Sequence, residues 1–251
     1  MIGGVINRIL GLAGFRIDRI SPAVAPVRLL RDVGPEINEV ITRVSPFTMT
    51  FPERIAAVCE SVSHLVKHGI AGDLVECGVW KGGSIMAAIL TLIRLGDVDR
   101  KVYLYDTYEG MTSPGQNDVA PNGIHAGVFG DVAGGWCFSP LEEVQRNINS
   151  TGYPPEKINF IKGKVEETIP GVMPEKIALL RLDTDWYEST RHELVHLFPL
   201  IVDGGIIIID DYGYWQGCRK AVDEYFAENH IEILLHRIDA TGRTGIVRVR
   251  K

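Results

Sequence analysis

Short apolar runs alternate with helical patterns along most of this chain, and no other feature constrains its fold as strongly. Two of the runs, residues 177–183 and 205–211, are continuous apolar stretches of the kind found in strands buried on both faces of a parallel sheet. Strands that alternate with helices predict an α/β fold with a doubly wound, mostly parallel sheet. Two late β segments after the last helix predict a C-terminal antiparallel hairpin. The predicted strands are residues 74–78, 101–106, 158–161, 177–183, 205–211, 231–238 and 245–250.

The domain organisation predicted is one large domain preceded by an N-terminal leader. A chain of 251 residues is long enough for one well-buried core and does not require two. Residues 1–46 are punctuated by four prolines and predict an arm or short helices that contact another subunit or the substrate. The main domain is expected over residues 47–251. No run is long enough for a transmembrane helix, so we expect no integral membrane segment.

Charge and cysteine usage narrow the class of protein. The formal net charge of −6 argues against nonspecific nucleic-acid binding, which needs a basic surface. The four cysteines are far apart and form no CxxC pair, so neither a zinc knuckle nor a disulfide framework is indicated. A reducing cytoplasm is therefore the expected setting, and the apolar leader favours a homo-oligomer.

Three aspartates follow the two long apolar runs. Asp183 ends the first run, and Asp210 and Asp211 end the second. The carboxyl ends of neighbouring parallel strands meet at the rim where open α/β sheets bind ligands, so these acids are expected to lie together. Clustered carboxylates repel one another, and a divalent cation is the usual remedy.

A glycine-rich turn joins the first predicted strand to its helix. The segment from Gly78 to Ser84 permits close backbone approach to a ligand, but Ser84 stands where a phosphate loop would need lysine. A tight turn without a ligand remains the alternative. Asp106 ends the second predicted strand and is well placed to accept hydrogen bonds from ribose hydroxyls. A turn for a polar tail and an acid for a ribose suit a nucleoside cofactor that lacks a pyrophosphate, such as S-adenosylmethionine.

With these residues in place, the chain resembles the macrocin O-methyltransferase (TylF/MycF) family over roughly residues 46 to 251. The motifs that carry the resemblance are Thr48-Met49-Thr50, Glu76-Cys77-Gly78-Val79-Trp80-Lys81-Gly82-Gly83, Asp106-Thr107-Tyr108-Glu109-Gly110-Met111, Leu182 to Thr190 and Gly204 to Tyr212. The resemblance implies a class I, Rossmann-like methyltransferase domain. It also implies S-adenosylmethionine as methyl donor, Mg²⁺ as cofactor, and sugar hydroxyls of macrolides or related natural products as acceptors.

The same resemblance implies a set of site residues. Cofactor contacts are expected at Thr48, Glu76, Cys77, Gly78, Val79, Trp80, Ser84, Asp106, Thr107, Tyr108, Glu109, Gly110, Met111, Lys162 and Gly163. Magnesium ligands are expected at Asp183, Asp210 and Asp211.

The hypothesis for the chemistry is that Mg²⁺ lowers the pKa of the acceptor hydroxyl and holds it in line with the sulfonium methyl. Asp185 follows Asp183 by two residues and is a candidate for the group that takes the proton, with Asp183 beside it. An equally weighted alternative is that Asp185 caps the following helix. Glu76 is expected to bind the ammonium of the cofactor's methionine part, or else the backbone N–H groups of the turn.

Two other functions stay open at this point. A catechol-type, metal-dependent O-methyltransferase would use the same acids, because catechols and sugar diols both chelate a metal. A non-catalytic cofactor-binding module would use the acids only as caps and ion-pair partners. The long segment from Met111 to Phe138 could close over a bulky acceptor, and this favours a glycosylated natural product.

Overall fold

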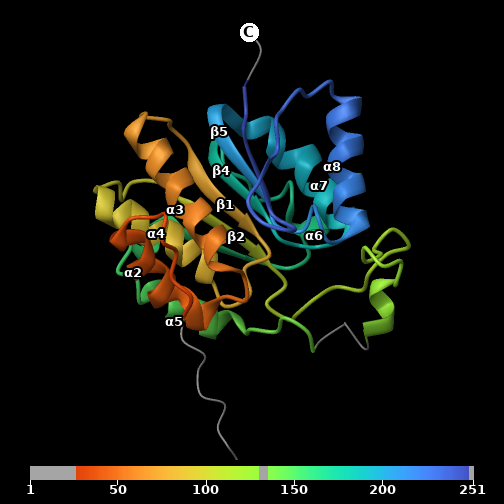
Figure 1. Ribbon diagram of the computed structural model, residues 1–251, viewed down its shortest axis with the longest axis horizontal. Helices are drawn as coiled ribbons and strands as arrows, with labels where there is room; N and C mark the ends of the chain where they lie inside the picture. The colour runs from red at the N-terminus through yellow and green to blue at the C-terminus, as the bar shows by residue number, and fades with distance from the viewer. Residues whose placement is uncertain (1–26, 130–134, 249–251) are drawn as a thin grey trace, which may run out of the picture.

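A seven-stranded sheet lies at the centre of the part of the chain that the structure describes (Figure 1). The structure is a computed structural model, and it describes residues 27–129 and 135–248. The strand order is β3-β2-β1-β4-β5-β7-β6. The strands are β1 (Asp73–Cys77), β2 (Val102–Asp106), β3 (Ile158–Lys162), β4 (Ile177–Leu182), β5 (Ile201–Ile209), β6 (His236–Arg237) and β7 (Arg243–Ile246).

Strand directions confirm the predicted fold class. The strands from β3 to β5 pair in parallel, while β7 pairs antiparallel with both β5 and β6. β5 shows why its apolar run is continuous rather than alternating. Ile206 and Ile208 point into one core cluster, and Ile207 and Ile209 point into the other, because helices cover both faces of the sheet.

The helices are distributed over the two faces. In Figure 1, α2 to α5 lie on one side of the sheet and α6 to α8 lie on the other. The α-helices are α2 (Pro35–Val44), α3 (Pro52–Lys67), α4 (Gly83–Leu95), α5 (Leu141–Asn149), α6 (Val165–Thr168), α7 (Tyr187–Leu197) and α8 (Gln216–Glu228). Short 3₁₀ turns are η1 (Ser45–Phe47), η2 (Ala126–Phe129), η3 (Pro155–Lys157) and η4 (Phe198–Leu200).

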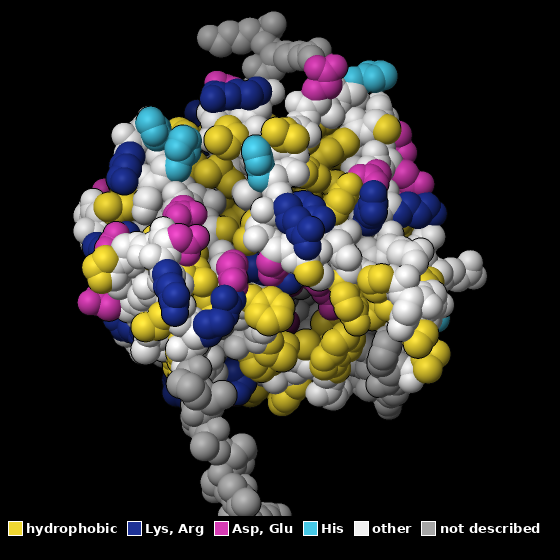
Figure 2. Space-filling model, viewed as in Figure 1, with side chains coloured by type: hydrophobic (Ala, Val, Ile, Leu, Met, Phe, Trp, Pro, Cys, Tyr) yellow, Lys and Arg dark blue, Asp and Glu magenta, His cyan; other side chains and the backbone are white. Residues whose placement is uncertain are grey.

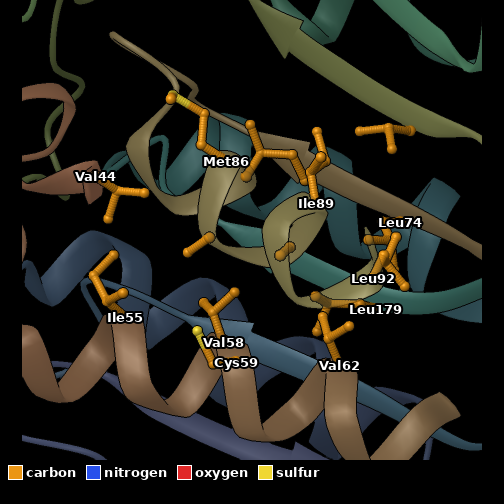
Figure 3. Packing of buried hydrophobic residues seen from close by; sticks show 14 of the residues in the cluster. Val44, Ile55, Val58, Cys59, Val62, Leu74, Met86, Ile89, Leu92 and Leu179 are labelled. Atoms are coloured by element: carbon orange, nitrogen blue, oxygen red, sulfur yellow. The ribbon is translucent and has the colours of Figure 1, made fainter. Parts of the chain in front are cut away.

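The helices α3 and α4 form the best-packed part of the first core cluster (Figure 3). Pro52 begins α3, where its missing N–H costs nothing, and Gly96 ends α4 with a positive φ of 75°. Val58 and Val62 of α3 point towards α4, and Ile89 of α4 belongs to the same cluster. This packing fixes the start of α4, and with it the glycine turn after β1.

Of the leader, residues 1–26 lie outside the described residues. The rest includes α2, whose apolar face joins the first core cluster through Val40, Ile41 and Val44. The predicted contact of the leader with another subunit or with a substrate stays a prediction. No helix within 27–129 or 135–248 is both long enough and apolar enough to cross a membrane.

Candidate active site

The carboxyl ends of β1, β2, β4 and β5 open into a cavity of about 380 Å³. Gly78, Asp106, Asp183 and Asp211 line it from these four strand ends. Figure 2 shows a hollow on this face of the molecule, with acidic side chains inside it and apolar side chains around it. The predicted meeting of motifs at one rim of the sheet therefore takes the form of a walled cavity.

The glycine turn after β1 is held by Asp106 at the end of β2. Gly78 has a φ of 82°, and a Cβ at this position would overlap the backbone oxygen of Asp183. One carboxylate oxygen of Asp106 accepts hydrogen bonds from the N–H groups of Val79 (2.6 Å) and Trp80 (3.0 Å). Its other oxygen accepts from the N–H of Tyr108 (2.7 Å). Asp106 thus fixes two turns of the cavity wall.

The expected cofactor residues divide into two groups. One group lines the cavity: Thr48, Gly78, Val79, Trp80, Ser84, Asp106, Thr107, Gly110, Met111 and Gly163. The other group does not: Glu76, Cys77, Tyr108, Glu109 and Lys162. Cys77 and Tyr108 are buried in the two core clusters, and Lys162 pairs with Glu109 at the surface (2.9 Å).

Glu76 is buried behind the cavity wall, with 1% of its surface exposed. It forms an ion pair with Arg181 of β4, while its second oxygen, Oε2, has no hydrogen-bond partner among the described residues. Burial, only partly offset by Arg181, raises the pKa of Glu76 to about 7. The turn N–H groups of Val79 and Trp80 donate to Asp106. Glu76 therefore does not bind these two N–H groups, which was the alternative role considered for it.

Three carboxylates converge at the strand ends. Oxygens of Asp183, Asp185 and Asp211 all lie within 4.8 Å of one another. Burial raises the pKa of all three, to about 7 for Asp185 and well above the ordinary range for Asp183 and Asp211, and neighbouring carboxylates raise it further. Such a group favours either protons or a cation.

Asp210 occupies a different position from its neighbour Asp211. Its side chain is buried between two guanidinium groups, those of Arg54 on α3 and Arg181 on β4 (2.7 Å to Arg181). Arg54 also binds Asp239 of the C-terminal segment (2.7 Å). Neither arginine was anticipated from the sequence. The available signals were an arginine inside the apolar run of β4 and one at the start of the apolar face of α3.

The turn from Asp183 to Tyr187 bears on the helix-cap alternative for Asp185. The helix α7 begins at Tyr187, and its N-cap position is Trp186. The N–H of Tyr187 donates to Asp118 of the long loop (2.8 Å), whereas a carboxylate oxygen of Asp185 lies within 4.8 Å of oxygens of Asp183 and Asp211. Asp185 also has a φ of 67°, in the left-handed region that Asp enters more readily than most non-glycine residues. Asp185 therefore faces the acids and does not cap α7.

Aromatic and apolar side chains surround the opening. Trp136 contacts the buried Trp186 and Trp215, with ring centroids 6.4 and 6.5 Å away. We call the exposed side chains here the apolar rim. It consists of Met49, Trp136 and Tyr214, which line the cavity, and of Phe51 and Phe138, which follow lining residues in the sequence.

Known proteins place this site in a family. The sequence matches the family described as Macrocin-O-methyltransferase (TylF) over residues 38–244. It is 35% identical over 195 residues, covering 78% of this chain and 73% of the relative, to 8-demethyl-8-(2,3-dimethoxy-alpha-L-rhamnosyl)-tetracenomycin-C 4'-O-methyltransferase of Streptomyces olivaceus. It is 33% identical over 199 residues, with 78% and 73% covered, to demethyldecarbamoylnovobiocin O-methyltransferase of Streptomyces niveus.

Solved structures give the same result. The O-methyltransferase NovP superposes with a TM-score of 0.70 at 33% identity, covering 81% of this chain and 83% of that one. The calicheamicin methyltransferase CalS11 shares the fold at 15% identity, with a TM-score of 0.62 over 90% and 98% of the two chains. The chain is therefore an O-methyltransferase and belongs to the macrocin O-methyltransferase family.

Proposed function

We propose that this enzyme transfers a methyl group from S-adenosylmethionine to a sugar hydroxyl of a glycosylated natural product, with the help of Mg²⁺. The relatives support the acceptor class, because their names specify a rhamnosyl-tetracenomycin and a novobiocin precursor. The observation that carries the proposal is the convergence of Asp183, Asp185 and Asp211 in a cavity that the glycine turn also lines. A methyl donor and a metal-bound acceptor need such an arrangement.

The glycine turn supports the cofactor assignment. Asp106 holds the turn, and Gly78, Thr107 and Gly163 leave backbone open to the cavity. When bound, S-adenosylmethionine would supply an electrophilic methyl on its sulfonium. Asp106 is placed to accept hydrogen bonds from the ribose. The buried and unpartnered Oε2 of Glu76 is a further acceptor that a nearby ammonium would satisfy.

The acid cluster supports the metal assignment. Mg²⁺ prefers carboxylate oxygens, and burial without a cation raises the pKa of Asp183 and Asp211. We propose that Asp183, Asp210 and Asp211 hold the ion. The oxygens of Asp210 accept hydrogen bonds from arginines, but a carboxylate has about four lone-pair sites and can use another to coordinate a cation. When bound, the ion would lower the pKa of the acceptor hydroxyl.

Asp185 is the proposed general base. Its carboxylate lies among the acids, and its left-handed backbone directs it to them rather than to the helix end. In its ionised form it would accept the proton that the acceptor hydroxyl loses, while the apolar rim and the three tryptophans exclude water from the reacting groups.

Two measurements test the proposal. We expect S-adenosylhomocysteine to bind in isothermal titration calorimetry, and labelled S-adenosylmethionine to methylate members of a glycoside panel with Mg²⁺ but not with EDTA. Absence of binding would overturn S-adenosylmethionine as the proposed methyl donor. Methylation of catechols but not glycosides would favour the catechol-type alternative, and binding without transfer to either panel would place the acceptor outside both classes.

The oligomeric state and the cellular compartment remain predictions. The four cysteines are free thiols, and this is compatible with the reducing cytoplasm that we propose. The proposed homo-oligomer can be checked by light scattering coupled to size-exclusion chromatography. The acceptor itself is proposed to be a small molecule with hydroxyl groups.

A further inference from the structure

A buried carboxylate lies outside the cavity and takes no part in the chemistry proposed above. Asp118 belongs to the long loop after β2, and its side chain has no exposed surface. Its oxygens accept hydrogen bonds from two backbone N–H groups, those of Gly115 (2.6 Å) and Tyr187 (2.8 Å). A carboxylate is costly to bury, so this position needs an explanation in what the side chain holds.

One side of Asp118 holds the turn that carries the general base. Tyr187 is the first residue of α7 and lies two positions after Asp185. Between them, the indole N–H of Trp186 donates to the backbone oxygen of Thr112 in the same loop (2.9 Å). The φ of 67° at Asp185 is a strained conformation, which persists only where surrounding contacts hold it. The loop supplies two of those contacts.

The other side of Asp118 rests against α8. A Cβ at Gly217, the second residue of α8, would overlap a carboxylate oxygen of Asp118. The N–H of Gln216 also donates to the backbone oxygen of Val119 (2.9 Å). The start of α8 lies a few residues after Asp211, so the same loop segment contacts the chain on both sides of the acid cluster.

We propose that Asp118 is a positioning residue that holds the turn from Asp183 to Tyr187, and so directs Asp185 towards the acceptor hydroxyl. The proposal rests on the proposed function of Asp185. Asp118 does not touch the cavity: it acts through the N–H of Tyr187 on one side and through close contact with Gly217 on the other. Residues that orient the groups of a metal or catalytic site affect its affinity and turnover without contacting the reactants.

Substitution of Asp118 tests this role. Asp118→Ala is expected to lower kcat by about 10- to 100-fold while the KM for S-adenosylmethionine stays within about twofold, since small misplacement of a reacting group is enough for such a loss. Affinity for Mn²⁺ alone, measured by electron paramagnetic resonance, should fall by about tenfold. Asp118→Asn keeps an oxygen for the N–H of Tyr187 but turns an amide nitrogen towards the N–H of Gly115, so its kcat should lie between those of the wild type and Asp118→Ala.

Gly217→Ala gives a second approach that leaves Asp118 in place. The added methyl group should displace the carboxylate and lower kcat in the same way. In the double variant, the methyl group occupies space that Asp118→Ala vacates, so its kcat should be no lower than that of Asp118→Ala alone. Asn117→Ala is the matched control in the same loop. It removes only the hydrogen bond that the side chain of Asn117 accepts from Lys220 of α8 (2.9 Å), so kcat and Mn²⁺ affinity should stay unchanged.

The outcomes separate the two proposals. If the wild type binds neither S-adenosylhomocysteine nor Mn²⁺, the proposed function fails. If the wild type is active, and Asp118→Ala and Gly217→Ala both match Asn117→Ala in kcat and Mn²⁺ affinity, the positioning role is overturned. A loss of melting temperature in Asp118→Ala, with kcat unchanged below that temperature, would overturn it too.

Discussion

At the scale of single residues, either Asp185 or Asp210 could be the third metal ligand beside Asp183 and Asp211. The proposed function makes Asp210 the ligand and Asp185 the general base. Asp185→Asn is expected to lower kcat by about 10²- to 10⁴-fold and to leave Mn²⁺ affinity nearly unchanged, since it removes a general base. Asp210→Asn is expected to weaken Mn²⁺ binding while S-adenosylhomocysteine still binds. The reverse result, with Mn²⁺ affinity lost only in Asp185→Asn, would make the three converging carboxylates the ligand set.

The residues that the sequence did not reveal share one property. Arg54, Arg181 and Asp118 act through contacts between segments far apart in the chain, and periodicity carries no information on such pairs. Asp183 and Asp211, by contrast, lie just after neighbouring parallel strands, so the direction of the strands was enough to bring them together. The converging set contains Asp185 in place of the expected Asp210, whose side chain binds the two arginines instead. Side-chain partners at this site could be recognised only once the packing of α3, β4 and α7 was known.

At the scale of elements, the glycine turn depends on how closely η1 approaches α4. A Cβ at Gly83 would lie 2.6 Å from the backbone oxygen of Phe47, so Gly83→Ala should displace the segment that carries Thr48. We expect S-adenosylhomocysteine affinity to fall by about tenfold or more, a loss of at least 1.4 kcal/mol. The matched control is Gly96→Ala at the other end of α4, where φ is 75° but no atom lies within 4 Å.

Titration calorimetry and thermal melts distinguish these two variants. Gly96→Ala should lower the melting temperature, because alanine is strained at positive φ, without changing the affinity for S-adenosylhomocysteine. Equal affinities in Gly83→Ala and wild type would contradict the proposed place of Thr48 in the cofactor site.

The C-terminal segment is coupled to the site through an ion pair. Burial raises the pKa of Asp239, but hydrogen bonds from Arg54 and two backbone N–H groups outweigh it and bring the pKa below the ordinary value of 3.8. Ionised Asp239 therefore stabilises the fold above the unfolded-state pKa, and this contribution is lost as the pH falls through the lower folded-state value. Asp239→Asn should cost about 1–3 kcal/mol at pH 7.

Thermal melts over a pH series check this prediction. The gap in melting temperature between wild type and Asp239→Asn should be full at pH 6 to 7 and should shrink below about pH 4. A gap that does not change with pH would show that the charge of Asp239 is not what stabilises the segment.

Strands could be predicted from the sequence where burial of apolar side chains dominates their formation. The parallel strands β1, β4 and β5 are mostly buried on both faces, and their apolar runs were enough to predict that they exist. The last two strands are shorter than expected, since β6 covers only His236–Arg237 and lies at the exposed edge of the sheet. Edge strands have no second neighbour to set their length, so residue pattern alone does not define where they end.

At the scale of the whole molecule, the fold concentrates acids where its two core clusters meet at the strand ends. The two buried arginines, Arg54 and Arg181, neutralise part of this charge: both bind Asp210, and Arg181 also pairs with Asp183 (2.8 Å). Asp183 and Asp211 remain with raised pKa values, so the molecule without a cation keeps a destabilised centre. Many enzymes are less stable because of their functional sites. A substitution at such a site can therefore change the melting temperature of the whole protein.

Asp211→Asn should therefore stabilise the metal-free protein. Burial first, and then Asp185 and Asp210, raise the pKa of Asp211 in the folded protein. The folded chain keeps this proton to a higher pH than the unfolded chain, so the wild type loses stability as the pH rises above the ordinary value of 3.8, whereas the amide does not titrate. The melting temperature of Asp211→Asn should exceed that of wild type by more at pH 8 than at pH 5.

Added Mg²⁺ should reverse this order, because an ion that binds only the folded state stabilises it by mass action, by about 2.7 kcal/mol at 100 times its dissociation constant. The wild type should then melt at a higher temperature than without the ion, and Asp211→Asn should respond far less. Calorimetric scans in EDTA and in Mg²⁺, at both pH values, measure all of these differences. A variant that is less stable than wild type in EDTA at pH 8 would show that Asp211 is held by favourable contacts, and the cavity would then have no unmet demand for a cation.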